Sequence, residues 1–225
     1  MRHAVVAVLR KDLQLELRAP QSVPAMALFA VTTLVVFHFA LQRNTVEGEL
    51  AAGVLAVTLL FAAILGIGRL FVAEREEGGL DAFLLAPVDR TALFVAKGLA
   101  LGCYLVALEL VLVPAFVVLL LGPGLDVAAL ARLAALLLLV DAGIAVVGTL
   151  VSAIAVQTRA RDLLVPLLGL PLLIPVVIGL ARGAEPLFLR AGAEALPGRW
   201  LLMLALYDLI FGLLAYALFD FLVED

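Results

Sequence analysis

Six long apolar segments, each close to the length needed to cross a lipid bilayer, constrain this chain more than any other feature. They lie near residues 23–41, 50–68, 99–121, 130–156, 163–180 and 201–222. A helix needs about 20 residues to cross the roughly 30 Å hydrocarbon core. Hydrophobic residues make up 65% of the 225 residues, and the mean hydropathy is +1.21. The chain is therefore predicted to be an all-α integral membrane protein. Its polar connections are short, so residues 1–225 are expected to form a single transmembrane domain.

Residues 1–20 predict an amphipathic helix that lies in the membrane surface before the first span. The apolar face consists of Val6, Leu9, Leu13 and Leu17, and the polar face consists of Arg10, Lys11, Gln14 and Arg18. This pattern is typical of helices that bury one face at the boundary between headgroups and acyl chains of the lipid bilayer. The apolar stretch 4–9 is too short for the core of a signal peptide.

The distribution of Lys and Arg predicts that both termini face the cytoplasm, since an even number of spans places them on one side. Ten cations lie on that side: Arg2, Arg10, Lys11, Arg18, Arg69, Arg75, Arg90, Lys97, Arg159 and Arg161. Four lie on the other side: Arg43, Arg182, Arg190 and Arg199. Cytoplasmic loops are enriched in Lys and Arg, so the connection between the second and third spans is expected in the cytoplasm.

That connection, residues 69–97, is called here the coupling segment. Charged residues gather around the Gly78-Gly79 pair, namely Glu74, Arg75, Glu76, Glu77 and Asp81, so this part is expected in water. Leu80, Phe83, Leu84 and Pro87 follow at i, i+3, i+4 and i+7, which predicts an apolar ridge on a short helix that ends at Pro87. An apolar ridge displayed in water favours a protein partner. We interpret the segment as a coupling helix, with an ordinary solvated loop as the alternative.

The chain lacks motifs for catalysis or nucleotide binding. It contains no G-x-S-x-G, no H-E-x-x-H and no G-x-x-x-x-G-K-[ST] phosphate loop. The net charge of −4 argues against nucleic acid as a partner. The protein is therefore not expected to be an enzyme, and any ATP would be bound by a partner chain.

Three carboxylates fall inside predicted spans: Glu109, Asp141 and Asp208. An ionised carboxylate is costly in hydrocarbon, so such a residue normally faces the bundle interior and is paired or protonated. One interpretation is a proton or cation relay. The alternative is a structural hydrogen bond between helices, with Arg132, Tyr104 or Tyr207 as candidate partners.

The fifth predicted span is rich in helix-disrupting residues, with Pro166, Pro171 and Pro175. Each proline removes a backbone hydrogen bond, so a kinked helix that barely crosses the bilayer is expected. The following stretch, 181–200, is expected to lie at the outer membrane surface or to fold back into the bilayer.

Three sequence motifs together resemble a known family of membrane proteins. The first comprises Arg69-Leu-Phe, Glu74, Gly78, Leu80-Asp81, Leu84-Leu85, Pro87, Arg90 and Ala96-Lys97. The second is Asp162-Leu-Leu-Val-Pro-Leu-Leu-Gly-Leu-Pro-Leu-Leu-Ile-Pro-Val after the basic turn Arg159-Ala-Arg161, and the third is Lys11-Asp-Leu-x-Leu-Glu-x-Arg18. Taken with the order of the spans, they resemble haem exporter protein B (CcmB) of the cytochrome c biogenesis system.

The resemblance implies an ABC-2 type permease-like subunit in the bacterial inner membrane. It would pair with a separate ABC ATPase subunit, a haem-handling membrane protein and a periplasmic haem chaperone. ATP hydrolysis by the partner would drive release of the haem-loaded chaperone, with haem as candidate cargo and no cofactor held by this chain. The residues implied in ATPase coupling are Glu74, Gly78, Leu80, Asp81, Leu84, Leu85, Pro87 and Arg90.

Two alternatives to this function stay open. They are an ABC-2 type permease for another amphiphilic substrate and a membrane scaffold without energy coupling.

His38 is a candidate haem ligand. It lies near the outer end of the first span, where a neutral imidazole could ligate haem iron. No second ligand follows at helical spacing, so a hydrogen-bonded interfacial histidine is the alternative. The spans show no evident pair of haem ligands, which favours mechanical coupling by this chain.

Overall fold

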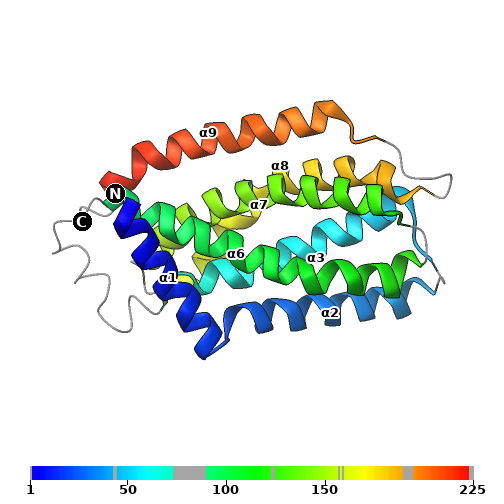
Figure 1. Ribbon diagram of the computed structural model, residues 1–225, viewed down its shortest axis with the longest axis horizontal. Helices are drawn as coiled ribbons and strands as arrows, with labels where there is room; N and C mark the ends of the chain where they lie inside the picture. Colours follow the sequence, from blue (N-terminus) through cyan, green and yellow to red (C-terminus); the bar gives the residue numbers. More distant parts are fainter. Residues whose placement is uncertain are drawn as a thin grey trace.

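The computed structural model describes residues 2–42, 45–72, 90–122, 125–156, 158, 160–189 and 195–222, and regular structure in these ranges is helical. The α-helices are α1 (Arg2–Arg18), α2 (Ser22–Leu41), α3 (Gly48–Arg69), α6 (Arg90–Phe116), α7 (Val127–Val156), α8 (Arg161–Ala184) and α9 (Gly198–Leu222). α6 continues into a π-helical turn, η1 (Val117–Leu121), and α8 into a 3-10 turn, η2 (Glu185–Phe188). All helices except α1 run along the long axis of one bundle (Figure 1).

Two names for the ends of the bundle are useful below. α1 and the last turns of α9 lie at the same end, which we call the terminal end (Figure 1). The connections at 45–47, 125–126 and 195–197 lie at the opposite end, which we call the far end.

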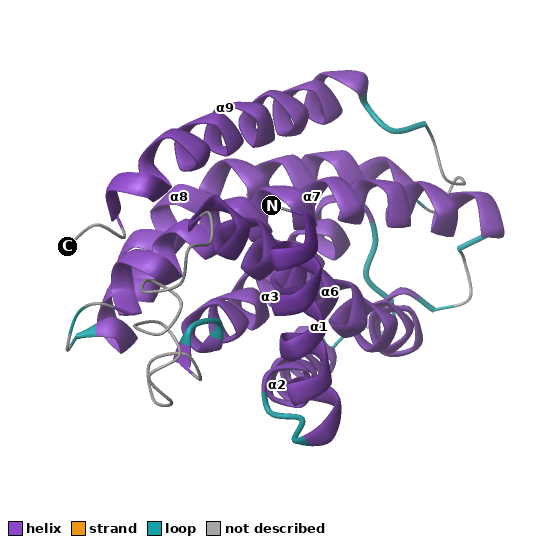
Figure 2. Ribbon diagram, turned by 60° about the vertical axis from the view of Figure 1, so that its left-hand side comes forward, coloured by secondary structure: helices purple, strands orange, loops and turns teal. Residues whose placement is uncertain are grey.

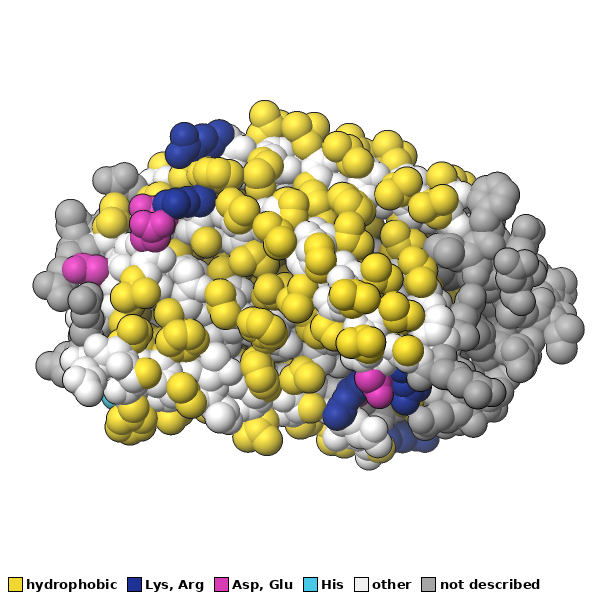
Figure 3. All heavy atoms as spheres, turned by 180° about the vertical axis from the view of Figure 1, so that it is seen from behind, with side chains coloured by type: hydrophobic (Ala, Val, Ile, Leu, Met, Phe, Trp, Pro, Cys, Tyr) yellow, Lys and Arg dark blue, Asp and Glu magenta, His cyan; other side chains and the backbone are white. Residues whose placement is uncertain are grey.

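The described part of the chain contains six helices that are long and apolar enough to cross a membrane. They are Ser22–Leu41, Gly48–Arg69, Thr91–Leu121, Val127–Val156, Arg161–Phe188 and Gly198–Leu218. Hydrophobic side chains cover the middle of the face seen in Figure 3, whereas charged side chains lie toward the two ends. An apolar belt with charged margins is the surface that a bilayer requires. The predicted all-α membrane protein with six spans is therefore confirmed.

α3 and α7 form the centre of the bundle. In their most apolar windows 67% of the residues are buried, compared with 17% in α2 and 11% in α9. α2 and α9 lie on opposite sides of the bundle (Figures 1 and 2). Small residues allow the central helices to approach closely. The buried small residues include Ala51, Ala52, Ala56, Ala62, Ala63 and Gly66 in α3 and Gly143, Gly148, Thr149, Ser152, Ala153 and Ala155 in α7.

The fifth span is longer than the sequence suggested. α8 continues through Pro166, Pro171 and Pro175 to Ala184, and η2 extends it to Phe188. The stretch 181–200, expected at the surface or folded back into the bilayer, does not begin at residue 181 as a separate segment, because residues 181–188 continue the helix and Phe188 is buried. The ring of Phe188 lies 5.3 Å from that of Phe116. Packing against neighbouring helices allows a membrane helix to tolerate internal prolines.

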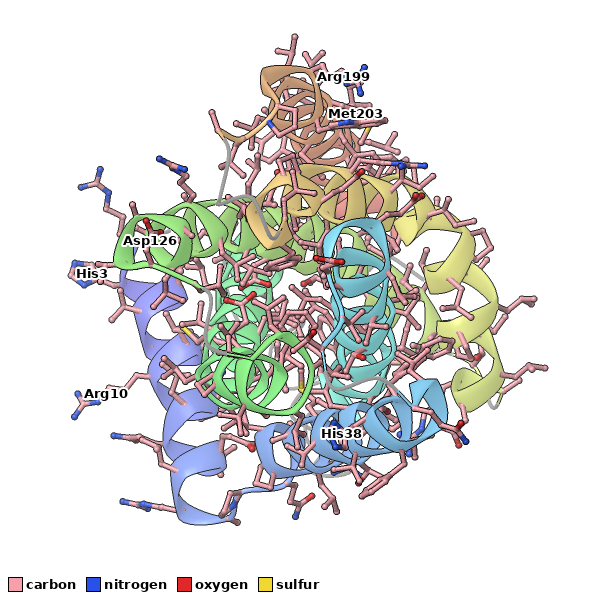
Figure 4. All side chains as sticks on the ribbon, turned by 90° about the vertical axis from the view of Figure 1, so that its right-hand side faces the viewer. His3, Arg10, His38, Asp126, Arg199 and Met203 are labelled. Carbon is pink, nitrogen blue, oxygen red and sulfur yellow. The ribbon has the colours of Figure 1, made fainter. Side chains whose placement is uncertain are left out.

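α1 lies across the bundle rather than along it. Figure 4 looks along the bundle and shows α1 lengthwise, with the side chains of His3 and Arg10 pointing outward. This orientation suits the predicted surface helix. Leu9 and Leu13 pack against the core, whereas Leu17 of the predicted apolar face is 82% exposed. The face that contacts the bundle therefore differs from the apolar face predicted from the sequence.

Candidate functional site

The coupling segment falls largely outside the described residues. Glu74, Gly78, Leu80, Asp81, Leu84, Leu85 and Pro87 all lie in the stretch 73–89, and Arg90 marks the first residue of α6. Their assignment to ATPase coupling thus stays a prediction. The structure does describe both ends of the segment, which are the end of α3 and the start of α6. These ends lie at the terminal end of the bundle.

A buried ion pair joins the two ends of the coupling segment to α1. Nζ of Lys97 on α6 lies 2.9 Å from Oδ2 of Asp12 on α1, and the two residues are only 2% and 5% exposed. The same Nζ donates a hydrogen bond of 3.1 Å to the carbonyl of Leu70, just beyond α3. It also lies 5.4 Å from the ring centroid of Phe71, within range of a cation–π interaction. One lysine therefore connects α1, α6 and the end of α3.

A second set of contacts fixes the elbow between α1 and α2. Oε1 of Glu16 accepts hydrogen bonds from the backbone N–H groups of Gln21, Ser22 and Val23, at 3.1, 2.9 and 2.8 Å. The first N–H groups of a helix have no partner within the helix, and the helix dipole favours a negative charge there. Arg69 at the end of α3 donates to the carbonyl of Gln21 at 2.7 Å. Thus α1, α2 and α3 meet at one polar corner.

A polar cavity of about 480 Å³ opens between these elements at the terminal end. We call it the base cavity. Its charged lining residues are Asp12, Glu16, Arg69, Lys97, Arg161 and Asp162. They come from α1, α3, α6 and α8, so the base cavity lies where the two ends of the coupling segment meet the start of the fifth span.

The structure brings together two of the three predicted intramembrane acids. The carboxyl groups of Glu109 on α6 and Asp141 on α7 interact across the interface between these helices. Asp208 on α9 lies apart from them and packs against α7 at Gly143, where a Cβ atom would be 2.5 Å from Oδ1 of Asp208. The absence of a side chain at Gly143 therefore makes room for this carboxyl group.

Tyr104 and Tyr207 were candidate partners for the buried acids. Their hydroxyl groups instead donate hydrogen bonds to backbone carbonyls. Tyr104 donates to the carbonyl of Asp12 at 3.4 Å, and Tyr207 donates to the carbonyl of Leu172 on α8. Neither hydroxyl therefore donates a hydrogen bond to the carboxyl group of Asp141. Tyr104 adds another contact between α1 and α6, beside the buried ion pair.

His38 forms a structural contact at the far end. Its Nδ1 lies within hydrogen-bond distance of the carbonyl of Leu119, and the backbone N–H of Val46 donates to the carbonyl of Leu120. The last carbonyls of a helix need partners from outside it, and these two contacts supply them to η1. Among the described residues, no group of three or more His, Cys, Asp and Glu side chains could hold a metal ion. The geometry thus supports the hydrogen-bonded histidine.

Comparison with known proteins decides the family. A family model described as CcmB protein matches residues 3–221, which is nearly the whole chain. The chain belongs to the CcmB family. This confirms the resemblance drawn from the three sequence motifs.

Several proteins named heme exporter protein B are similar to this CcmB-family chain along most of its length. The protein from Rhodobacter capsulatus is 37% identical over 193 residues, which cover 84% of each chain. The protein from Paracoccus denitrificans is 35% identical over 202 residues, which cover 88% of each chain. The protein from Bradyrhizobium diazoefficiens is 30% identical over 215 residues, which cover 95% of this chain and 96% of that protein.

The polar contacts at the terminal end of this CcmB-family chain were not predicted from the sequence. In the sequence, Lys97 is one of several cations near a span, and Asp12 belongs to neither face of the predicted surface helix. A usable signal was present, because Lys97 lies in the apolar stretch 92–108, where a cation normally requires a nearby acid. The sequence could not show that the acid comes from a helix 85 residues earlier.

Proposed function

We propose that this CcmB-family chain is the membrane subunit of a haem exporter that serves cytochrome c maturation. A separate ABC ATPase subunit binds the coupling segment and supplies the energy. ATP hydrolysis in that subunit drives release of the haem-loaded periplasmic chaperone, with which a further haem-handling membrane protein is associated. The names of the similar proteins support haem as the cargo.

The observation that carries the coupling role is the buried contact between Lys97 and Asp12. A force applied to residues 73–89 reaches the bundle through the end of α3 and the start of α6. Lys97 joins both of these ends to α1, with the hydrogen bond to Leu70 as the link to α3. Because the three elements are connected by buried polar contacts, they are expected to move together.

The orientation follows from the distribution of charge. In the sequence, ten Lys and Arg residues lie beside the connections assigned to the cytoplasm and four beside the opposite connections, which favours placing the terminal end in the cytoplasm of a bacterial inner membrane. The coupling segment then faces the compartment that contains ATP. Its proposed contact surface consists of Leu80, Leu84 and Leu85, flanked by Glu74 and Asp81 and ended by Pro87.

Replacing Leu84 with Asp is expected to weaken binding of the ATPase subunit by roughly 30-fold, since central apolar contacts of an interface commonly contribute 2 kcal/mol or more. Affinity is measured with both subunits in lipid nanodiscs, and cytochrome c maturation is measured in cells. Val127→Asp is the matched control, because Val127 is 85% exposed at the far end. Normal ATPase binding and normal maturation in the Leu84→Asp variant would contradict the proposed contact surface.

Deletion of the gene for this protein tests whether haem is the cargo. Without this chain, haem is expected to accumulate on its periplasmic carrier, and c-type cytochromes are expected to be lost. Both are measured by haem staining of separated proteins, with the reintroduced wild-type chain as the control. Normal cytochromes after deletion, with another amphiphile retained in the cell, would identify a permease for a different substrate.

A further inference from the structure

Glu109 and Asp141 place two carboxyl groups against each other near the middle of the membrane-spanning bundle. Asp141 is only 4% exposed, and the two groups interact across the interface between α6 and α7. In the part of the chain that the structure describes, both side-chain oxygens of Asp141 and Oε1 of Glu109 are buried without a hydrogen-bond partner. The carboxyl group of Asp141 is therefore aimed into a site where the described residues provide no donor.

The cations on the same two helices lie well away from this site. Lys97 precedes Glu109 by twelve residues, or about 18 Å along α6, and is paired with Asp12 of α1. Arg132 precedes Asp141 by nine residues, or about 13 Å along α7. Neither cation stands at the level of the carboxyl pair.

The other helices that the structure describes bring no further charge to this level except on α9. Residues 23–37 of α2, 50–68 of α3 and 163–181 of α8 contain no ionisable side chain. On α9, Asp208 packs at Gly143, and the hydroxyl of Tyr207 is bonded to the carbonyl of Leu172. The carboxyl pair thus lies in an apolar section of the bundle, with Asp208 as a separate acid on another helix.

Two neighbouring ionised carboxylates would raise the free energy of the folded protein in this apolar section of the bundle. At a separation of about 4 Å, like charges repel by about 4 kcal/mol at an effective dielectric constant of 20. Each ion also loses its hydration. A proton bound to one carboxyl removes one charge and creates an O–H donor for the other carboxylate. The resulting charge-assisted hydrogen bond stabilises the remaining ion.

We infer that Glu109 and Asp141 form a proton-binding site that holds one proton between their carboxyl groups. α6 runs without interruption from Arg90 to Glu109, so the site lies on the helix that leads directly out of the coupling segment. Proton occupancy thereby sets how closely α6 packs against α7. A proton fits this pair better than a metal ion, because the described residues offer no cluster of three or more ligating side chains.

Infrared difference spectroscopy of the full chain in lipid nanodiscs tests the site without reference to haem or the ATPase. The background variant is Asp208→Asn, which removes the separate acid and retains the pair. It is compared with a variant that also carries Glu109→Gln and Asp141→Asn. These amides match the carboxyl groups in size, and circular dichroism shows whether both proteins have the same helix content.

The expected result is a protonated-carboxyl band at neutral pH that shifts in D2O and is lost completely in the combined variant. In either single variant, Glu109→Gln or Asp141→Asn, the remaining carboxyl group should stay protonated, because an ionised carboxylate is costly in this apolar section, so the band should change frequency rather than disappear. A band that persists in the combined variant, or no band in the background variant, would overturn the inference. Disappearance of the band on adding Na⁺ or K⁺ at constant pH would show a metal cation site and would overturn it as well.

Discussion

Replacing Lys97 with Met is expected to lower the free energy of unfolding by roughly 3–5 kcal/mol, because it removes the buried cation beside Oδ2 of Asp12 and leaves only the exposed Lys11 near Oδ1. Met retains most of the length of the lysine side chain, so the loss reflects charge more than volume. Asp12 is only 5% exposed, so its carboxylate has little contact with solvent to compensate for the lost ammonium group. The free energy is measured by denaturant titration in detergent micelles, followed by circular dichroism.

The chain offers a matched control for this variant. Lys11 also lies near Asp12, at 3.3 Å from Oδ1, but its side chain is 48% exposed. An exposed pair of this kind typically contributes less than about 1 kcal/mol, so Lys11→Met should have a small effect. The double variant Asp12→Leu with Lys97→Met removes both charges and should recover most of the lost stability. Equal effects of Lys97→Met and Lys11→Met would refute the importance of the buried pair.

The second large effect is expected from Gly148→Leu, where α7 packs tightly against α3 and α6. A Cβ atom at Gly148 on α7 would lie 2.7 Å from Cγ1 of Ile67 on α3 and 2.9 Å from Cδ2 of Leu101 on α6. Three more carbon atoms have no room there, so α7 must move away from both neighbours. The expected loss of stability is about 3 kcal/mol, at the upper end of overpacking effects. It is measured by the same denaturant titration.

Gly102→Leu is the control for the glycine variant. Gly102 lies in α6, and a Cβ atom there meets no other atom within 4 Å. Replacing a helical glycine that faces open space improves helix propensity by up to about 1 kcal/mol, so this variant should be neutral or more stable. A loss of stability as large as that of Gly148→Leu would show that the close approach of the helices is not the cause.

The number of spans and their order were predictable because the rule that governs them is local. A segment of sufficient length and hydrophobicity crosses the bilayer whatever its neighbours are. The end of the fifth span was misplaced at Leu180, because prolines and the charged residues that follow suggested a surface segment. In the structure, Nη1 of Arg182 lies 3.0 Å from Oε1 of Glu49 on α3 and 3.3 Å from Oε2 of Glu185. Charged residues therefore form part of the last turns of this helix at the far end.

The candidate sites were predictable only in part. Buried acids could be recognised singly, because each is an exception within an apolar span. The sequence could not show that Glu109 meets Asp141 while Asp208 packs at Gly143, since this depends on the rotation of three helices about their axes. The same limit applies to α1, where the sequence could not show that Asp12 is buried against the bundle.

The amino-acid sequence by itself determined the class of the protein, its six spans and its family, because hydrophobic length and short motifs are properties of contiguous residues. Only the tertiary structure decided which polar side chains meet. Lys97 forms an ion pair with Asp12, and Glu16 caps the start of α2, through contacts between helices. The free energy of such contacts depends on distance and burial, and neither quantity is defined until the helices have packed.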